Sequence, residues 1–239
     1  MQKIKFLTAI ASLFVWTANA QVLNEDADLL ASYKSEIPYF QELITGGQYE
    51  EAPKNIEGHP FYFSRQFENG NLRINGVTYS DVPLMYDEFR DQVLTFHPIQ
   101  KQKLLINPEK VEAFRLANGE EFRFFEGNEN YYYNGNGLYQ VLNKKAILVL
   151  VKHYKTTKAK QEVGRFTDEF IEKEARFLWK EGQFYSISKA YQVAPILGLE
   201  KKILKKKMKA MGLRFKGDPD KYLLEAVDFA EEFLTQSAQ

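Results

Sequence analysis

The sequence LRINGVTY, residues 72–79, places an Asn-Gly pair between two short runs of apolar and β-branched residues. Asparagine and glycine both tolerate the positive φ angles of a type I′ turn, so the pair favours a two-residue hairpin connection. Residues 72–74 and 77–79 are therefore predicted to be neighbouring antiparallel strands.

The same dipeptide recurs along the middle of the chain, at positions 69–70, 118–119 and 134–135. Many of the segments beside these turns alternate apolar and polar residues, which is typical of strands with one wet face. The further predicted strands are 61–67, 84–87, 93–97, 104–106, 113–116, 121–125, 138–142 and 146–153. Residues 146–151 are continuously apolar and are the candidate central strand.

The last third of the chain changes pattern. Residues 177–179 and 184–186, separated by Glu181-Gly182, predict one more hairpin. Three helices are then expected: one capped by Ser188, one over residues 200–211, and one that opens at Asp218-Pro219. The third gathers its apolar residues on one side, as a helix that packs against a partner does. Residues 155–174 fit neither pattern clearly.

These elements predict an α+β fold in which an antiparallel, twisted β-sheet, either an open barrel or a sandwich, is followed by C-terminal helices. Three segments are expected: a signal peptide over residues 1–20, a polar and partly helical segment over 21–57, and a single domain over 58–239. Within that domain residues 58–186 are rich in β-structure and residues 188–236 are helical.

The beginning of the chain has the pattern of a secretory signal peptide. Lys3 and Lys5 precede an apolar run over residues 6–16, and Ala18-Asn19-Ala20 supplies small residues at a cleavage site. Cleavage near Ala20 predicts a periplasmic or secreted protein. No later apolar run approaches the roughly 20 residues that a membrane-spanning helix needs, so the mature chain is expected to have no transmembrane span.

Composition excludes several classes of function. The chain contains no cysteine, which rules out thiolate catalysis, cysteine-bound zinc, thiol redox chemistry and acylation at the cleavage site. Its 32 basic and 32 acidic residues balance, and the loss of Lys3 and Lys5 leaves a net charge of −2. Such a chain has no global field that would hold nucleic acid. No cofactor or metal is expected either.

Three stretches resemble a family of uncharacterised exported proteins of Bacteroidota. They are GHPFYFSRQFENGNLRINGVTYSDVPLMYDEFRD at residues 58–91, LINPEKVEAFRLANGEEF at residues 105–122, and the tail over residues 177–233. The resemblance implies export and the order of sheet followed by helices. It implies no activity and no catalytic residue.

A first candidate site is the acidic segment that contains Asp87 and Asp91. Two carboxylates can act as general acid and base if a cleft raises the pKa of one of them, and His59 could assist. A polar loop with local ion pairs explains the same residues. The chain has no Gly-x-Ser-x-Gly motif, no phosphate-binding loop and no metal-binding histidine spacing, so no residue is assigned as catalytic.

A second candidate is the loop GNENYYYNGNG, residues 127–137. Tyr131 and Tyr133, with the amides of Asn134 and Asn136, have the chemistry of a sugar- or peptide-binding surface. The alternative is a long hairpin whose tyrosines cover the edge of the sheet.

A third candidate is a lysine-rich helix, on which Lys201, Lys205 and Lys209 share one face. A basic amphipathic helix can bind an anionic membrane surface or an acidic partner. It can also be a solvated face whose charge is offset by the acidic helix that follows.

Taken together, these features predict a binding or interaction protein of the cell envelope without catalytic activity. Its expected partner is a protein, a glycan or an anionic membrane surface. The alternative is a carboxylate-dependent hydrolase that acts on envelope polymer or glycan.

Overall fold

The computed structural model describes residues 41–44, 46–97, 99–128, 131, 133, 135–162 and 165–237. The chain divides into two compact units, Met1–Leu43 and Ile44–Gln239. The predicted signal peptide lies outside the described residues, as do Asn134 and most of the segment assigned to residues 21–57. The short helix α2 covers Gln41–Ile44, and everything that follows concerns the second unit.

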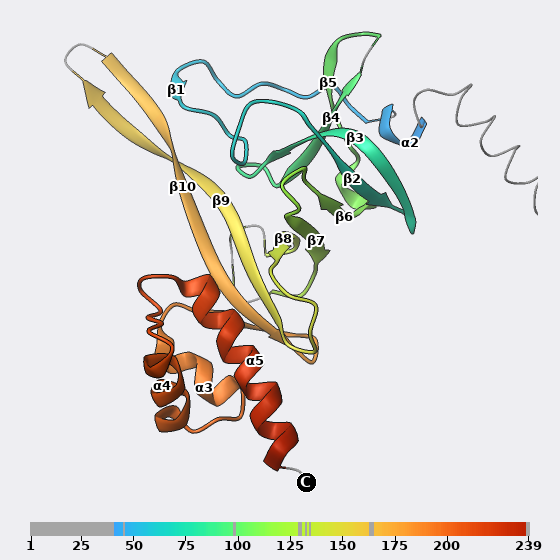
Figure 1. Cartoon of the computed structure of the whole chain (residues 1–239). Coiled ribbons are helices and arrows are strands. Elements are labelled where there is room, and N and C mark those ends of the chain that lie inside the picture. The colour runs from blue at the N-terminus through green and yellow to red at the C-terminus, as the bar shows by residue number, and fades with distance from the viewer. Residues whose placement is uncertain are drawn as a thin grey trace, which may run out of the picture. The chain divides into compact units, whose positions relative to one another are not determined.

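The second unit is built on an open sheet with C-terminal helices, which confirms the predicted α+β class (Figure 1). Among the described residues the strands are β1 (Ile56–Glu57), β2 (Glu68–Ile74), β3 (Val77–Asp87), β4 (Gln92–His97), β5 (Gln102–Leu105), β6 (Val111–Arg115), β7 (Glu121–Phe125), β8 (Gly137–Val141), β9 (Leu148–Glu162), β10 (Arg165–Lys180) and β11 (Gln183–Ile187). Their order is β1-β10-β9-β8-β7-β6-β2-β3-β4-β5, with β11 also paired to β10. The β1–β10 pairing is parallel, and the other pairings are antiparallel.

The hairpin predicted from residues 72–79 is present. Ile74 pairs with Val77, and the two turn residues have positive φ angles, 48° at Asn75 and 78° at Gly76. The Asn-Gly pair at 69–70 is different, because it lies inside β2 at a bulge. There a side chain on Gly70 would collide with the backbone oxygen of Arg115 on β6, so this glycine permits close strand approach and forms no turn.

The strand expected over residues 61–67 is absent. Phe61 makes a single bridge to Asp87, and the residues after it run as an irregular loop. Phe61 is nevertheless fully buried, in a cluster with Tyr49, Met85 and Leu94. Its apolar pattern therefore reflects packing under a loop rather than membership of a ladder.

The segment 155–174 fitted no pattern, and its described residues, 155–162 and 165–174, form most of a long two-stranded arm. β9 and β10 pair continuously from Leu148 and Trp179 to Glu162 and Arg165. β8 pairs with β9 only through Gln140 and Val141, so beyond Val151 the arm continues without that neighbour (Figure 1). The apolar run predicted as the central strand begins β9, which lies between β8 and β10.

The C-terminal helices are η2 (Ala190–Gln192), α3 (Val193–Ile196), α4 (Lys201–Ala210) and α5 (Pro219–Ser237). Asp218 caps α5 as predicted, since its Oδ1 accepts the backbone N–H of Lys221 at 2.9 Å. Ser188 does not cap a helix. The first helical turn begins instead at Ala190, and the Ser188 N–H donates to Oε1 of Gln192.

The helices pack on one face of β9, β10 and β11. Val149, Leu178 and Ile187 from these strands join the buried side chains of α3, α4 and α5 in one apolar core. Leu150 and Phe177 point to the opposite face, where they meet Tyr139 and Val141 of β8. β9 and β10 are thus covered on both faces at their helix-bearing end. Within the described part of the chain, no helix is both long and apolar enough to cross a membrane.

Candidate functional site

The β3–β4 turn holds the two carboxylates that the sequence singled out, and each has its own set of donors. Asp87 is fully buried. Its Oδ1 accepts the backbone N–H groups of Phe89 at 3.0 Å and Arg90 at 2.9 Å, and its Oδ2 accepts the Tyr49 hydroxyl at 2.7 Å. Burial, together with the Asp87 carboxylate, raises the pKa of the Tyr49 hydroxyl. Asp87 therefore anchors the turn.

Asp91 is paired with a lysine from the arm. The Lys152 ammonium, which is fully buried, lies 2.7 Å from Asp91 Oδ2 and donates to the Leu138 carbonyl at 2.9 Å. The other oxygen, Oδ1, accepts the Tyr86 hydroxyl at 2.6 Å. Burial lowers the pKa of Lys152, and the Asp91 charge opposes that effect.

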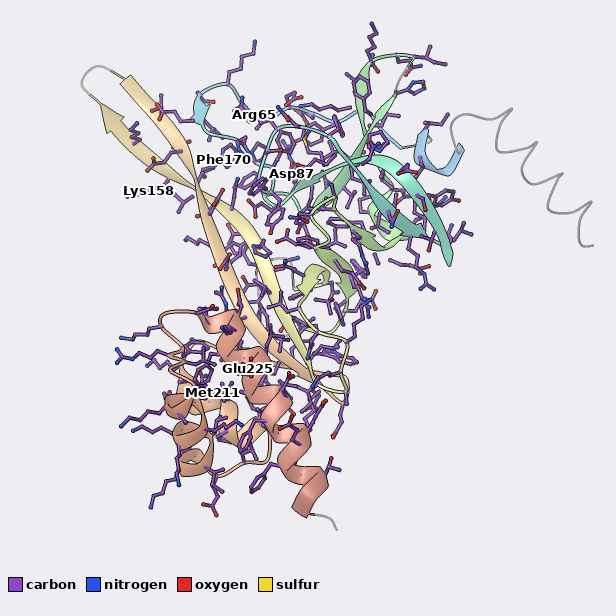
Figure 2. The ribbon with its side chains drawn as sticks, in the orientation of Figure 1. Arg65, Asp87, Lys158, Phe170, Met211 and Glu225 are labelled. Carbon is purple, nitrogen blue, oxygen red and sulfur yellow. The ribbon has the colours of Figure 1, made fainter. Side chains whose placement is uncertain are left out.

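A second buried lysine joins the arm to the same turn. Lys155 Nζ lies 3.0 Å from Glu88 Oε1 and donates to the carbonyl oxygens of His59 and Phe61 at 3.0 and 2.7 Å. Burial raises the pKa of the Glu88 carboxyl to about 7, against the opposing charge of Lys155. Phe170 on β10, labelled in Figure 2, packs edge-on against Phe89 of the turn.

This network has the character of structural ion pairing. An acid–base pair must reach a substrate, whereas Asp87 is fully buried and Asp91 is enclosed by Tyr86, Lys152 and the Leu138 backbone. The alternative reading of this segment, a polar loop with ion pairs, describes the observed contacts. Sequence reasoning missed Lys152 and Lys155, for which the only signal was two lysines that follow a continuously apolar strand.

The three histidines occupy separate environments. His59 lines a cavity of about 350 Å³ together with Arg65, Lys103 and Phe170, and neither Asp87 nor Asp91 lines that cavity. Burial, and then the nearby Lys155 charge, lowers the pKa of the His59 imidazole. His153 bonds Gln140 at 2.7 Å, and His97 accepts the Gln100 N–H at 3.2 Å. Among the described residues no cluster of histidine and carboxylate side chains could hold a metal ion.

The described part of the tyrosine loop packs on the arm. The Tyr131 ring lies 5.2 Å from Phe177 in an edge-on arrangement, and the Tyr133 ring lies 4.9 Å from Tyr154. Asn136 Oδ1 accepts the backbone N–H of Gly127 at 2.9 Å. Both tyrosines are partly buried, and these contacts correspond to a loop that covers the sheet.

The lysine-rich helix borders a groove of about 810 Å³ among the C-terminal helices. Its apolar lining comes from η2, α3, α4, α5 and the loop between α4 and α5: Ala190, Tyr191, Ala194, Leu204, Met208, Leu213, Phe215 and Tyr222. Figure 2 labels Met211, at the end of α4, and Glu225, on α5, the two longer helices that contribute to the groove. A pocket of this size and composition is typical of ligand-binding sites.

The charged residues that line the groove are all basic. Lys201, Lys205 and Lys209 recur every four residues on α4, and Arg214 follows in the loop to α5. All three predicted lysines therefore lie at this site. The structure brings them to an apolar groove that sequence reasoning missed; the available signal was the apolar pair Leu213 and Phe215 directly after the helix-ending Gly212.

Three acidic residues of α5 pair with basic residues outside the groove. Asp220 pairs with Arg176 of β10 at 3.1 Å, and Asp228 and Glu231 pair with Lys145 at 2.8 and 3.0 Å. Within the described ranges no ion pair involves the four basic residues of the groove. The charges of Asp220, Asp228 and Glu231 are thus offset by Arg176 of β10 and by Lys145 of the β8–β9 connection.

Comparison of the chain with protein-family models, with curated proteins and with solved structures found no match.

Proposed function

We propose that this protein is an exported binding protein of the cell envelope, without catalytic activity, and that it contacts its partner through the C-terminal groove. The observation that carries the proposal is the combination of an apolar groove with four basic side chains that have no ion-pair partner among the described residues. A partner that is anionic and partly apolar gains from both features.

Two further observations support binding over hydrolysis. Asp87 and Asp91, the carboxylates of the hydrolase alternative, are held by their own hydrogen-bond donors in the β3–β4 turn. The described tyrosines of the 127–137 loop are engaged with the arm, whereas the groove combines an apolar lining with basic side chains that have no ion-pair partner among the described residues. Export is supported by the signal-peptide pattern of residues 1–20.

The proposal is tested by charge reversal on two stripes of the same helix. Lys205→Glu with Lys209→Glu changes the groove, whereas Lys202→Glu with Lys206→Glu makes the same charge change at exposed positions that do not line it. Tagged wild-type and variant proteins are incubated with solubilised envelope, and bound material is identified by mass spectrometry. We expect the wild type and the 202/206 variant to retain the same material and the groove variant to lose it.

Equal retention by all three proteins would show that the groove is not the contact surface. Release of soluble fragments from purified envelope glycan by the wild-type protein would contradict the absence of catalysis. Export is checked separately by fractionation and N-terminal sequencing, with a mature protein that starts at Gln21 as the expected result.

A further inference from the structure

We infer that the groove binds a single-chain anionic amphiphile, a free long-chain alkyl carboxylate, with its chain along the apolar floor and its head group at the α4 lysines. This inference rests on the proposed function and names the chemical class of its ligand. Three observations carry it: the apolar lining of the groove, the positive charge of the residues that border it, and the position of Lys202 and Lys206 outside it.

The lining of the groove favours an apolar chain. Leu204, Met208 and Ala194 each leave 2% of their area exposed, whereas Tyr191, which also lines the groove, is 60% exposed. A single alkyl chain makes contact through methylene groups alone, so it gains from this apolar lining without needing a hydrogen-bond partner. The thioether of Met208 adapts readily to a flexible chain.

The rim favours a negative head group. Lys201, Lys205 and Lys209 follow one side of α4 over roughly 12 Å, and Arg214 adds a fourth cation after the helix. No acidic residue lines the groove. A carboxylate placed there is attracted to several ammonium groups at once, whereas a neutral hydrocarbon gains nothing from them.

The other lysines of α4 distinguish binding of this ligand from binding to a membrane surface. Lys202 and Lys206 are exposed on α4 but do not line the groove. A bilayer of anionic lipids attracts every basic residue near its surface, and this attraction decays only over a Debye length. Both groups of lysines would therefore contribute to membrane binding: Lys201, Lys205 and Lys209 at the groove, and Lys202 and Lys206 outside it. A free carboxylate inside the groove responds to the groove stripe alone.

The test is calorimetric titration of the purified protein with decanoate, dodecanoate and tetradecanoate, each below its micelle concentration. We expect one site per chain and a Kd that tightens with chain length, by up to about 15-fold for each added pair of methylenes, which is the limit for full burial of the chain. Dodecanol, with the same chain and no charge, is expected to bind at least about tenfold more weakly than dodecanoate.

Variants then locate the site. Lys205→Glu with Lys209→Glu is expected to weaken dodecanoate binding more than about tenfold, and the matched Lys202→Glu with Lys206→Glu less than about threefold. Tyr191→Ala removes an aromatic wall that is 60% exposed and changes no charge. This variant is expected to weaken the binding of carboxylates of every chain length, while the preference for dodecanoate over dodecanol remains. Circular dichroism checks that each variant is folded.

The outcomes separate the inference from the function on which it rests. If no alkyl carboxylate binds but the groove variant still loses envelope material, the ligand class is wrong and the proposed function stands. If the protein binds phosphatidylglycerol vesicles and the two double charge reversals weaken that binding equally, α4 binds a membrane surface and the inference is overturned. Binding of an acidic amphipathic peptide, but not of dodecanoate, would also overturn it. If the groove variant still binds dodecanoate and still retains envelope material, both the inference and the proposed function are refuted.

Discussion

The ammonium nitrogen of Lys152 lies 2.7 Å from Oδ2 of Asp91, although 61 residues separate the two in the chain. Lys152 belongs to the arm strand β9, and Asp91 belongs to the turn between β3 and β4. Both side chains are shielded from water, with exposed fractions of 0% and 8%. Together with the Lys155–Glu88 pair, this pair links the arm to the β3–β4 end of the sheet.

Removal of one partner of this pair is expected to destabilise the fold strongly. Asp91→Asn and Lys152→Met each leave a buried group without its counter-charge, so we expect each to lower the free energy of unfolding by about 3–5 kcal/mol. The double variant removes both charges and is expected to lose much less than the sum of the two. Urea denaturation of the four proteins measures these values, and strictly additive losses would contradict the pairing.

Gly137 is expected to be intolerant of any side chain. It begins β8, and a Cβ atom there would overlap Asp91 Oδ2 and crowd Lys152 Nζ. Gly137→Ala must displace this ion pair and is expected to cost about 2–3 kcal/mol, the usual range for overpacking a well-filled site. Gly47→Ala is the matched control, because a Cβ at Gly47 meets nothing within 4 Å. An unchanged denaturation midpoint for Gly137→Ala would contradict the close packing.

Glu88 gives the stability a specific pH dependence. Burial raises the pKa of its carboxyl from 4.5 to about 7, so the folded state binds a proton that the unfolded chain releases. Its contribution is complete below pH 4.5 and is lost as the pH rises through 7. Glu88→Gln does not ionise. We therefore expect its free energy of unfolding, relative to wild type, to rise by about 3 kcal/mol between pH 4.5 and 8. A difference that stays flat or falls across this range in parallel urea titrations would be inconsistent with a raised pKa.

Asp218 is expected to stabilise the start of α5. Its Oδ1 accepts the backbone N–H of Lys221 at 2.9 Å, so Asp218→Ala leaves a helix-terminal donor without its partner. The expected cost is about 1 kcal/mol, whereas Asp218→Asn keeps an accepting oxygen and is expected to cost less. Thermal denaturation compares the two variants. Equal midpoints for both would indicate that the capping bond contributes nothing.

Most features that depend on a few neighbouring residues were predicted correctly, whereas the helix cap assigned to Ser188 was wrong. The Asn75-Gly76 turn, the Glu181-Gly182 turn and the Asp218-Pro219 helix start all match the structure. Each is governed by backbone angles or by a hydrogen bond within three residues, and both are encoded locally. The basic face of α4 was predicted for the same reason, because helical spacing alone places Lys201, Lys205 and Lys209 together.

Features that depend on residues far away in the chain were not predicted correctly. The Asn-Gly pair at 69–70 resembles a turn, but the proximity of β6 holds it inside β2. The residues around Phe61 resemble a strand, yet they are an irregular segment whose aromatic ring fills a core. No strand could be predicted for the arm because its sequence is rich in lysine and glutamate. Its strands are defined by the continuous pairing of β9 with β10.

The amino-acid sequence by itself determined the turns at Asn75-Gly76 and Glu181-Gly182, the start of α5, the amphipathic faces and the order of sheet followed by helices, because these follow from backbone preference and side-chain periodicity. Only the tertiary structure decided which charges meet. Lys152 and Lys155 are drawn into the β3–β4 turn, since buried charges require partners from wherever the chain brings them. Asp220, Asp228 and Glu231 of α5 instead pair with Arg176 and Lys145 at partly exposed positions. The α4 lysines that line the groove have no ion-pair partner among the described residues, because the fold brings those acids to other basic side chains.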